Sequence, residues 1–421
     1  MTEDPHCGPA GHAPRAACSV AEVVANGLCI GCGLCETVTA GRVRMQMQPY
    51  GSLRPAPLDG FTKAEEKKVL AACPGVVAES RPSRAPNRDP VWGAYTVMRH
   101  AWAGESLRRF ASSSGGCLTA LACHLLQSKR AAFILHVGPD PGQPMRNRWV
   151  HSRTIEEVQS NAGSRYGPVA PLAGLKDALD RQENFAIIAK PCDLGAVHML
   201  SKTDPRIDRF CVARLAMVCG GQSRLMKSQA LLDELEIEEK DVSLFRYRGF
   251  GNPGTTRVET HDGLAFERTY RQMWRDEAGW EIETRCKFCP DALGETCDIV
   301  AADVWPGCDP VGEDAGFNGI IVRTPVGDAL LTDAVAANDI VLGRHILPRE
   351  FDSFQPHQVR KKQALKARFN GLSQVGAPII RTVGLRLDEL AGMVDERQFR
   401  EETLKTYRRK LEGRFSETVT T

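Results

Sequence analysis

The sequence predicts a mixed α/β (α+β) chain that has a cysteine-rich N-terminal module and a helical C-terminal tail. Three observations predict this class. Strand and helix patterns alternate between residues 117 and 193, as in a layered α/β domain. Closely spaced cysteines and glycines occupy residues 29–35. From about residue 349 the chain becomes basic and helical in texture.

The elements expected in the middle of the chain are three helices and two strands. The helices are expected at 117–127, 155–161 and 172–182, and the strands at 131–137 and 185–189. The following stretch, 244–324, is richer in strand patterns and glycine. Further helices are expected in the tail, at 359–369 and 401–415.

Composition divides the chain into four parts. Residues 1–28 are polar and are expected to form a flexible lead, followed by a cysteine module at 29–80. Ser80–Pro90 is rich in Pro, Arg, Ser and Asn, which is typical of a linker. A larger domain at 91–345 and a helical basic tail at 346–421 complete the chain.

The overall composition narrows the class of protein. The chain has 421 residues, of which 42% are hydrophobic, and a net charge of +2. This balance gives no indication of a nucleic-acid or anionic-membrane partner. No apolar run approaches the roughly 18–20 residues of a membrane span. The 15 cysteines, several in metal-binding spacing, favour a reducing cytoplasm in which thiols are kept for metal.

The strongest motif is Cys29-Ile30-Gly31-Cys32-Gly33-Leu34-Cys35, with a distant Cys73-Pro74. Three thiols spaced C-x-x-C-x-x-C reach three irons of a 4Fe–4S cube, and a Cys-Pro commonly supplies the fourth ligand. Gly31 and Gly33 permit the left-handed turns that point N–H groups at sulfur. Cys29, Cys32, Cys35 and Cys73 are therefore expected to hold one cluster, with structural zinc as the alternative.

A serine- and glycine-rich segment directly precedes the first expected helix. Ser113, Ser114, Gly115 and Gly116 could cradle a phosphate at a helix N-terminus, although serine is also an ordinary N-cap. Arg165 and Tyr166 offer a cation that could pair a pyrophosphate, or simply a turn with a surface arginine. No G-x-G-x-x-G follows a strand, so a standard dinucleotide-binding fold is not supported.

The expected strand at 185–189 leads into Lys190-Pro191-Cys192-Asp193. Ligands of open α/β sheets bind at the carboxyl ends of strands, so Cys192 is well placed for a site, although a lone cysteine there is more often simply buried. A second pair, Cys286 and Cys289, has no partner pair nearby in the sequence. From spacing alone, zinc and a cluster both remain open for it.

These motifs occur in an order that resembles a known family. The ordered set is Ser113-Ser114-Gly115-Gly116, Arg165-Tyr166-Gly167-Pro168-Val169, Pro191-Cys192, Cys219-Gly220, Cys286-x-x-Cys289-Pro290-Asp291, Asp298-Ile299 with Asp303, and Ile321-Val322-Arg323-Thr324. From about residue 25 to 325 the chain resembles the beta-subunit family of coenzyme F-420 hydrogenases and dehydrogenases. That family also includes iron–sulfur flavoproteins that reduce chlorophyll intermediates.

The resemblance implies a fold, cofactors and site residues. It implies a ferredoxin-like cluster module joined to a flavin-binding α/β domain. It implies a second 4Fe–4S cluster, and FAD rather than FMN near the serine turn and Arg165-Tyr166. Lys190 departs from the small residue usual before Pro-Cys, so it could contact flavin phosphate, contact a substrate carboxylate, or point to solvent. The ligands implied for the second cluster are Cys192, Cys219, Cys286 and Cys289.

The function implied is electron transfer to an organic acceptor. A ferredoxin or a dehydrogenase or hydrogenase partner subunit would donate electrons, which would pass through two clusters to FAD and leave as hydride. The alternatives are a coenzyme F-420-linked subunit, with F-420 as substrate, and a non-catalytic electron-transfer subunit that docks through its basic tail. A homo-oligomer is left open. Tyr166, His198 and Asp193 are candidate proton donors, and no catalytic residue is selected.

The other cysteines are expected to be structural. Cys117, Cys123 and Cys211 fall in expected helix or strand. Cys297 and Cys308 flank Asp303, and either could replace a predicted cluster ligand.

Overall fold

A single mixed sheet of eight strands organises the computed structural model, which describes residues 13–274, 281–310 and 314–417. The order across the sheet is β16 (Ile340–His345), β6 (Val97–Ala103), β15 (Asn318–Val322), β14 (Ile299–Asp303), β10 (Cys211–Met217), β9 (Phe185–Ala189), β7 (Phe133–Pro139) and β8 (Asn147–Ser152). Strands β7, β9, β10 and β14 run parallel, and the outer pairings are antiparallel. The predicted α/β class is confirmed.

Helices cover both faces of this sheet, because side chains alternate along the buried strands. Ile134 and Leu215 pack on the side of α5 (Cys117–Gln127) and α13 (Pro325–Ala336). Their neighbours Leu135 and Ala216 pack on the side of α7 (Leu175–Asp180) and α8 (Pro191–Ser201). With both faces buried, the central strands read as apolar runs in the sequence. Helices α4 (Ser106–Ala111), α6 (Ile155–Ser160), α9 (Arg206–Phe210) and η1 (Pro171–Gly174) lie around them.

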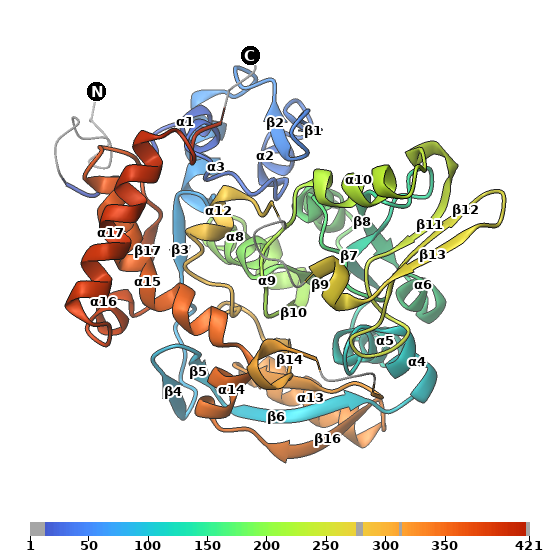
Figure 1. The fold of residues 1–421 in the computed structure, drawn as a ribbon. Helices are drawn as coiled ribbons and strands as arrows, with labels where there is room; N and C mark the ends of the chain where they lie inside the picture. The colour runs from blue at the N-terminus through green and yellow to red at the C-terminus, as the bar shows by residue number, and fades with distance from the viewer. Residues whose placement is uncertain (1–12, 275–280, 311–313, 418–421) are drawn as a thin grey trace.

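A smaller three-stranded sheet stands beside the main one (Figure 1). It consists of β11 (Val242–Arg246), β12 (Thr256–Thr260) and β13 (Ala265–Arg268), with α10 (Leu225–Glu234), η2 (Glu239–Asp241) and α11 (Tyr270–Trp274) nearby in sequence. Its core contains Phe245, Tyr247 and Trp274. Helix α12 (Thr284–Lys287) and η4 (Pro306–Cys308) follow.

The N-terminal module carries the first cysteine motif. It contains α1 (Val20–Ala25), α2 (Leu34–Val38), the β1–β2 hairpin (Arg44–Met47, Leu53–Ala56) and α3 (Lys63–Ala72). The flexible lead expected at residues 1–28 is wrong for residues 13–28; residues 1–12 lie outside the described residues. Ser19 caps α1, and Val23 packs in a core with Leu28. The valines of α1 give this otherwise polar segment an apolar face that it buries.

The C-terminal tail is helical, as predicted, and it packs against the N-terminal module (Figure 1). Its helices are α14 (Pro348–Phe354), α15 (Pro356–Ser373), α16 (Leu387–Ala391) and α17 (Glu396–Leu411). Strand β17 (Arg381–Val383) pairs in parallel with β3 (Val77–Glu79). Leu365 and Phe369 of α15 share a core with Val23 and Leu28. The tail and the module therefore stabilise each other.

The predicted linker, Ser80–Pro90, includes β4 (Asn87–Asp89), which pairs with β5 (Gly93–Tyr95) just beyond the linker.

One basic residue of the tail is buried, although the basic sequence around it suggests exposure to solvent. Lys362 is buried and pairs with Glu295, which also accepts from Arg386 at 2.6 Å. No helix within the described ranges is both long and apolar enough to cross a membrane.

Candidate functional site

Three parallel strands end at the wall of one cavity of about 1050 Å³. Strand β9 ends at Ala189, and the next residue, Lys190, lines the cavity. Cys219 follows the end of β10, and Asp303 ends β14. The carboxyl ends of parallel strands meet at one sheet edge, so the fold concentrates polar side chains here. The cavity lies in the upper part of the size range of ligand sites.

The serine turn forms another wall of the cavity. Ser113, Ser114 and Gly116 line it, just before the first residues of α5. The Ser113 hydroxyl oxygen accepts the Ser164 N–H at 2.7 Å, which ties this turn to the one that carries Tyr166. Gly115 does not line the cavity. A Cβ there would lie 2.7 Å from the Asn318 nitrogen, so its role is close packing.

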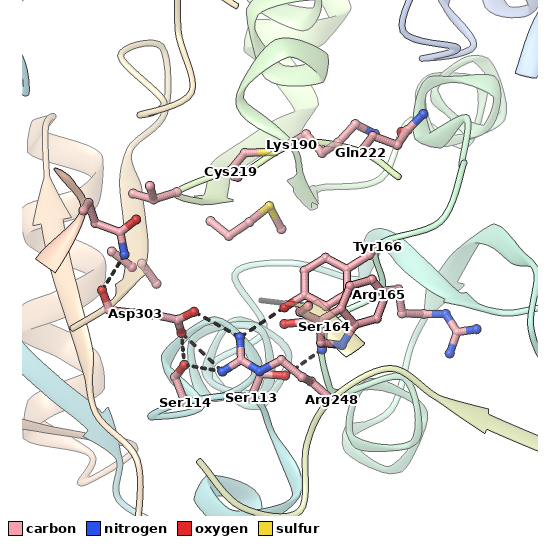
Figure 2. Close-up of a pocket in the computed structure, with 18 of the residues that line it drawn as sticks. Ser113, Ser114, Ser164, Arg165, Tyr166, Lys190, Cys219, Gln222, Arg248 and Asp303 are labelled. Atoms are coloured by element: carbon pink, nitrogen blue, oxygen red, sulfur yellow. Dashed lines mark hydrogen bonds and ion pairs between the residues drawn. The ribbon is translucent and has the colours of Figure 1, made fainter. Parts of the chain in front are cut away.

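Arg248 is the central cation of this wall, and sequence reasoning missed it. It is 2% exposed, and it pairs with Asp303 at 3.0 Å. It also donates to the hydroxyl oxygens of Ser114 at 3.1 Å and Tyr166 at 3.2 Å (Figure 2). Ser114 in turn donates to Asp303. Burial lowers the pKa of Arg248, but Asp303 and Tyr166 outweigh burial and raise it, so the guanidinium stays charged.

Tyr166 presents its phenol to the cavity beside this cation. Burial raises the pKa of its hydroxyl, Asp303 adds to that effect, and Arg248 opposes it. The phenol therefore holds its proton at neutral pH, and it remains a candidate proton donor. Asp193 lines the cavity as well, whereas His198 is not among the lining residues.

The role of Arg165 in pairing a pyrophosphate stays a prediction: the residue lines the cavity, but its guanidinium is bonded to other protein groups. In Figure 2 its guanidinium points away from Arg248 and Asp303. It donates to the Asn147 side chain and to the Pro144 carbonyl at 2.6 Å, and it lies 5.1 Å from the Tyr247 ring centroid. These partners use its donors, so Arg165 positions the turn. Arg248 supplies the positive charge at the cavity wall that was expected from Arg165.

Lys190 is held by the carboxylate that follows it in the sequence. Its ammonium lies 2.9 Å from Asp193, which is fully buried and also accepts the Lys190 N–H at 3.2 Å. Burial lowers the pKa of Lys190, but Asp193 and the thiols of Cys192 and Cys219 raise it by more than burial lowers it. The net pKa therefore lies above its ordinary value. The solvent-pointing alternative is therefore excluded for Lys190.

The first four predicted thiols converge in the N-terminal module. Burial raises the pKa of Cys32 and Cys35, and the neighbouring thiols raise it further. The pKa of Cys73 rises to about 12 for the same reasons. Gly31 and Gly33 are left-handed, as predicted, with φ of 73° and 87°. A Cβ on Gly33 would lie 2.6 Å from the Ala173 nitrogen, so the loop fits tightly against the main domain.

The second four thiols converge from separate elements, as the resemblance implied. Cys192 starts α8, Cys219 follows β10, Cys286 lies in α12, and Cys289 follows α12. Burial, together with the nearby thiols of Cys219 and Cys289, raises the pKa of Cys286 to about 12. Burial also raises the pKa of Cys192, and the Cys289 thiol adds to that rise. Cys219 and Cys286 also line the cavity.

The two alternative thiols, Cys297 and Cys308, lie in different surroundings. Cys297 is fully buried, and its charged neighbours are Asp291, Arg323 and Asp298. Cys308 lines the cavity near Tyr270. Cys123 is buried in α5. Across the described part of the chain, no group of three or more His, Cys, Asp or Glu is arranged to hold a metal ion.

Comparison with known proteins gives the family. Residues 98–176 match the family model for the N-terminal region of the coenzyme F420 hydrogenase/dehydrogenase beta subunit. Residues 182–345 match the model for the C-terminal region of the same beta subunit. The chain belongs to this beta-subunit family. The resemblance seen in the sequence is confirmed, while the first cysteine set and the whole tail, residues 346–421, lie outside the matched ranges.

The relatives of this family member are subunits of oxidoreductases. A subunit of the F(420)H(2) dehydrogenase of Methanosarcina mazei is 22% identical over 318 residues, 73% of this chain and 83% of the relative. The beta subunit of the coenzyme F420 hydrogenase of Methanothermobacter thermautotrophicus is 23% identical over 260 residues, 59% of this chain and 84% of the relative. The beta subunit of the F420-dependent formate dehydrogenase 1 of Methanococcus maripaludis is 25% identical over 224 residues, 52% and 54% respectively.

A solved structure of the family shares the fold. A chain of the F420-reducing [NiFe] hydrogenase complex from Methanosarcina barkeri superimposes with a TM-score of 0.55 at 18% identity. The match covers 70% of this beta-subunit family member and 98% of that chain. The family member thus contains the common fold together with residues that the solved chain lacks.

Proposed function

We propose that the chain is an iron–sulfur flavoprotein oxidoreductase that carries electrons through two 4Fe–4S clusters to FAD and on to an organic acceptor by hydride transfer. The observation that carries this proposal is the position of the second thiol set. Two of its four members, Cys219 and Cys286, form part of the wall of the cavity that the serine turn also lines. A cluster held by this set would therefore border a flavin bound in the same cavity.

The residues fit both kinds of cofactor. A four-iron cube takes one thiolate at each corner, which needs a wider spacing than zinc with its Zn–S distances of about 2.3 Å. The thiols of each set lie close enough to raise one another's pKa, as ligands of one shared group would. For the flavin, the N-terminus of α5 offers N–H donors to phosphate, and Arg248 offers a positive charge at the same wall.

A bound flavin would supply the exchange between one-electron and two-electron chemistry. The chain's own residues would orient it and keep water out. Arg248, fixed by Asp303, would present a permanent positive charge at the cavity wall. Tyr166, protonated at neutral pH, would offer a proton beside that charge.

Two electron donors and two acceptors fit this design. A ferredoxin or a partner subunit would donate, because the first thiol set lies in a separate module. Coenzyme F-420 is the acceptor suggested by the names of the relatives. A ferredoxin-dependent reductase of another organic substrate is the rival, and a non-catalytic subunit of a larger dehydrogenase is the third alternative. We further propose that the chain works in the cytoplasm.

Metal and flavin analysis of anaerobically purified protein tests the proposal. About eight irons and one flavin per chain are expected from two four-iron clusters. Cys289→Ser should lose about half of the iron, whereas Cys123→Ala, outside both sets, should lose none. Zinc in place of iron would sink the proposal. Reoxidation of the reduced flavin by coenzyme F-420 would favour the F-420-linked alternative over its rivals.

A further inference from the structure

One buried arginine lies between the two thiol sets. Arg285 belongs to α12, immediately before Cys286, and only 2% of it is exposed. Its Nε and Nη2 donate to the carbonyl of Pro74 at 3.1 and 2.8 Å. Pro74 directly follows Cys73 of the first set. The side chain thus spans from the α12 loop of the second set to the backbone of the first.

The charged neighbours of Arg285 are mainly thiols. Burial alone lowers its pKa, but the thiols of Cys289, Cys192 and Cys286 more than reverse that and raise it. Arg285 also lowers the pKa of the Cys73 thiol, across in the first set. A guanidinium stays protonated in proteins, so this charge is permanent.

A nearby carboxylate is already neutralised by another residue. Asp193 lies near Cys32 of the first set and Cys192 of the second. It pairs with Lys190 at 2.9 Å. The hydrogen bonds of Arg285 go to a carbonyl and a thiol. A buried charge is costly unless it is compensated, so thiolates are the fitting counterpart for Arg285.

We propose that Arg285 is the shared counter-charge of both thiol sets, and that it sets the reduction potentials of the two clusters together. This inference rests on the proposed function, because it requires a cluster in each set. Adding an electron to a cluster makes it more negative, so a fixed cation stabilises the reduced form. Arg285 therefore raises both potentials, and it acts as a positioning residue that exchanges no electron itself.

A second bridge between the sets supplies a neutral control. The side-chain nitrogen of Gln222 donates to the Ile30 carbonyl at 3.1 Å, within the first motif. Its backbone N–H donates to the Cys286 sulfur at 3.4 Å. Gln222→Met removes the side-chain bridge but changes no charge. Lys361→Gln removes a charge that faces the second set, through Cys219.

The test is a redox titration of the full chain, followed by electron paramagnetic resonance, for the wild type, Arg285→Gln, Arg285→Lys and the two controls. Arg285→Gln should lower the reduction equilibrium of both clusters at least tenfold, which is 59 mV for one electron. Arg285→Lys and Gln222→Met should leave the reduction equilibrium of both clusters within tenfold of the wild type, and Lys361→Gln should lower that of the second cluster alone. If Arg285→Gln shifts one cluster or neither, the inference is overturned.

Iron content keeps the test decisive if Arg285→Gln fails to assemble. Loss of iron from both sets, restored by Arg285→Lys, supports a shared counter-charge. Loss confined to the Cys286 side overturns it. Failure of the proposed function would be seen separately, in a wild-type protein that holds fewer than two clusters.

Discussion

Arg248 and Asp303 form an ion pair at 3.0 Å that joins the two sheets of the molecule. Arg248 follows β11 of the small sheet, and Asp303 ends β14 of the large sheet. The Arg248 guanidinium also lies 4.7 Å from the ring centroid of Trp305. The cavity is therefore closed by a contact between two elements far apart in the sequence, and its shape depends on that contact.

Arg248→Gln should weaken flavin binding about tenfold or more, because it removes a positive charge from the cavity wall and unit charges about 4 Å apart near a protein surface interact by roughly 4 kcal/mol. Flavin titration monitored by fluorescence quenching measures this. Arg165→Gln is the matched comparison, since its guanidinium is bonded to Asn147 and Pro144 instead. It should lower the melting temperature but change the flavin affinity of folded protein less than twofold. The reverse pattern would restore Arg165 as the ligand.

Gly33→Ala should remove iron from the first set and leave the second set and the flavin in place. The added Cβ would meet the Ala173 nitrogen at 2.6 Å, in a backbone with φ of +87°. Iron and flavin counts on purified protein measure the outcome. Gly41→Ala has a similar φ of +84° with no atom within 4 Å of its Cβ. It isolates the backbone strain, about 1 kcal/mol, and should keep all iron. Equal iron loss in both variants would contradict the packing argument.

Glu295→Gln should destabilise the chain by about 3–5 kcal/mol, because it leaves two buried cations without their carboxylate. Glu295 pairs with Lys362 and Arg386, and its side chain is 3% exposed. Burial raises its pKa, but the two cations lower it to about 2, so it is charged at neutral pH. Urea unfolding at pH 7 gives the free energy. Glu389→Gln, in an exposed pair with Arg88 at 3.0 Å, should cost less than about 1 kcal/mol.

Some parts of the site could be predicted because one local pattern determines them. The first cysteine loop is such a case: C-x-x-C-x-x-C with Gly31 and Gly33 predicts the left-handed backbone within seven residues. The strand that ends before Lys190 was another, because an apolar run bounded by Lys-Pro leaves little choice. The left-handed glycines and the strand were both confirmed by the fold.

Other parts depend on contacts between distant segments. Arg248 lies in an irregular stretch after β11, and nothing near it in the sequence marks it as a cavity residue. Arg165 stood in a recognisable motif, but the carbonyls that bind it come from residues 144–146 and 245. Lys362 stands in a basic run that suggests exposure to solvent. Its burial depends on Glu295, which is far away in the chain. A single sequence gives no signal for such pairings.

Lys361→Gln should raise the KM for an anionic acceptor about threefold to fivefold, with little change in kcat. Lys361 and its neighbour Arg360 project from α15 into the wall of the cavity, and Lys361 lowers the pKa of the nearby Cys219 thiol. A cation at a partly open wall attracts carboxylate or phosphate groups by roughly 0.5–1 kcal/mol. Since that attraction stabilises the bound acceptor and the transition state alike, it changes KM more than kcat.

Steady-state kinetics with coenzyme F-420 and with a neutral quinone, at low and high salt, measure this effect. The increase in KM should be confined to the anionic acceptor and should shrink at high salt, because screening weakens the attraction. Arg397→Gln removes an equal charge from an 88% exposed side chain of α17 and should change neither KM. If the Lys361 variant raises both KM values equally, the cation shapes the cavity wall and does not select the charge of the acceptor.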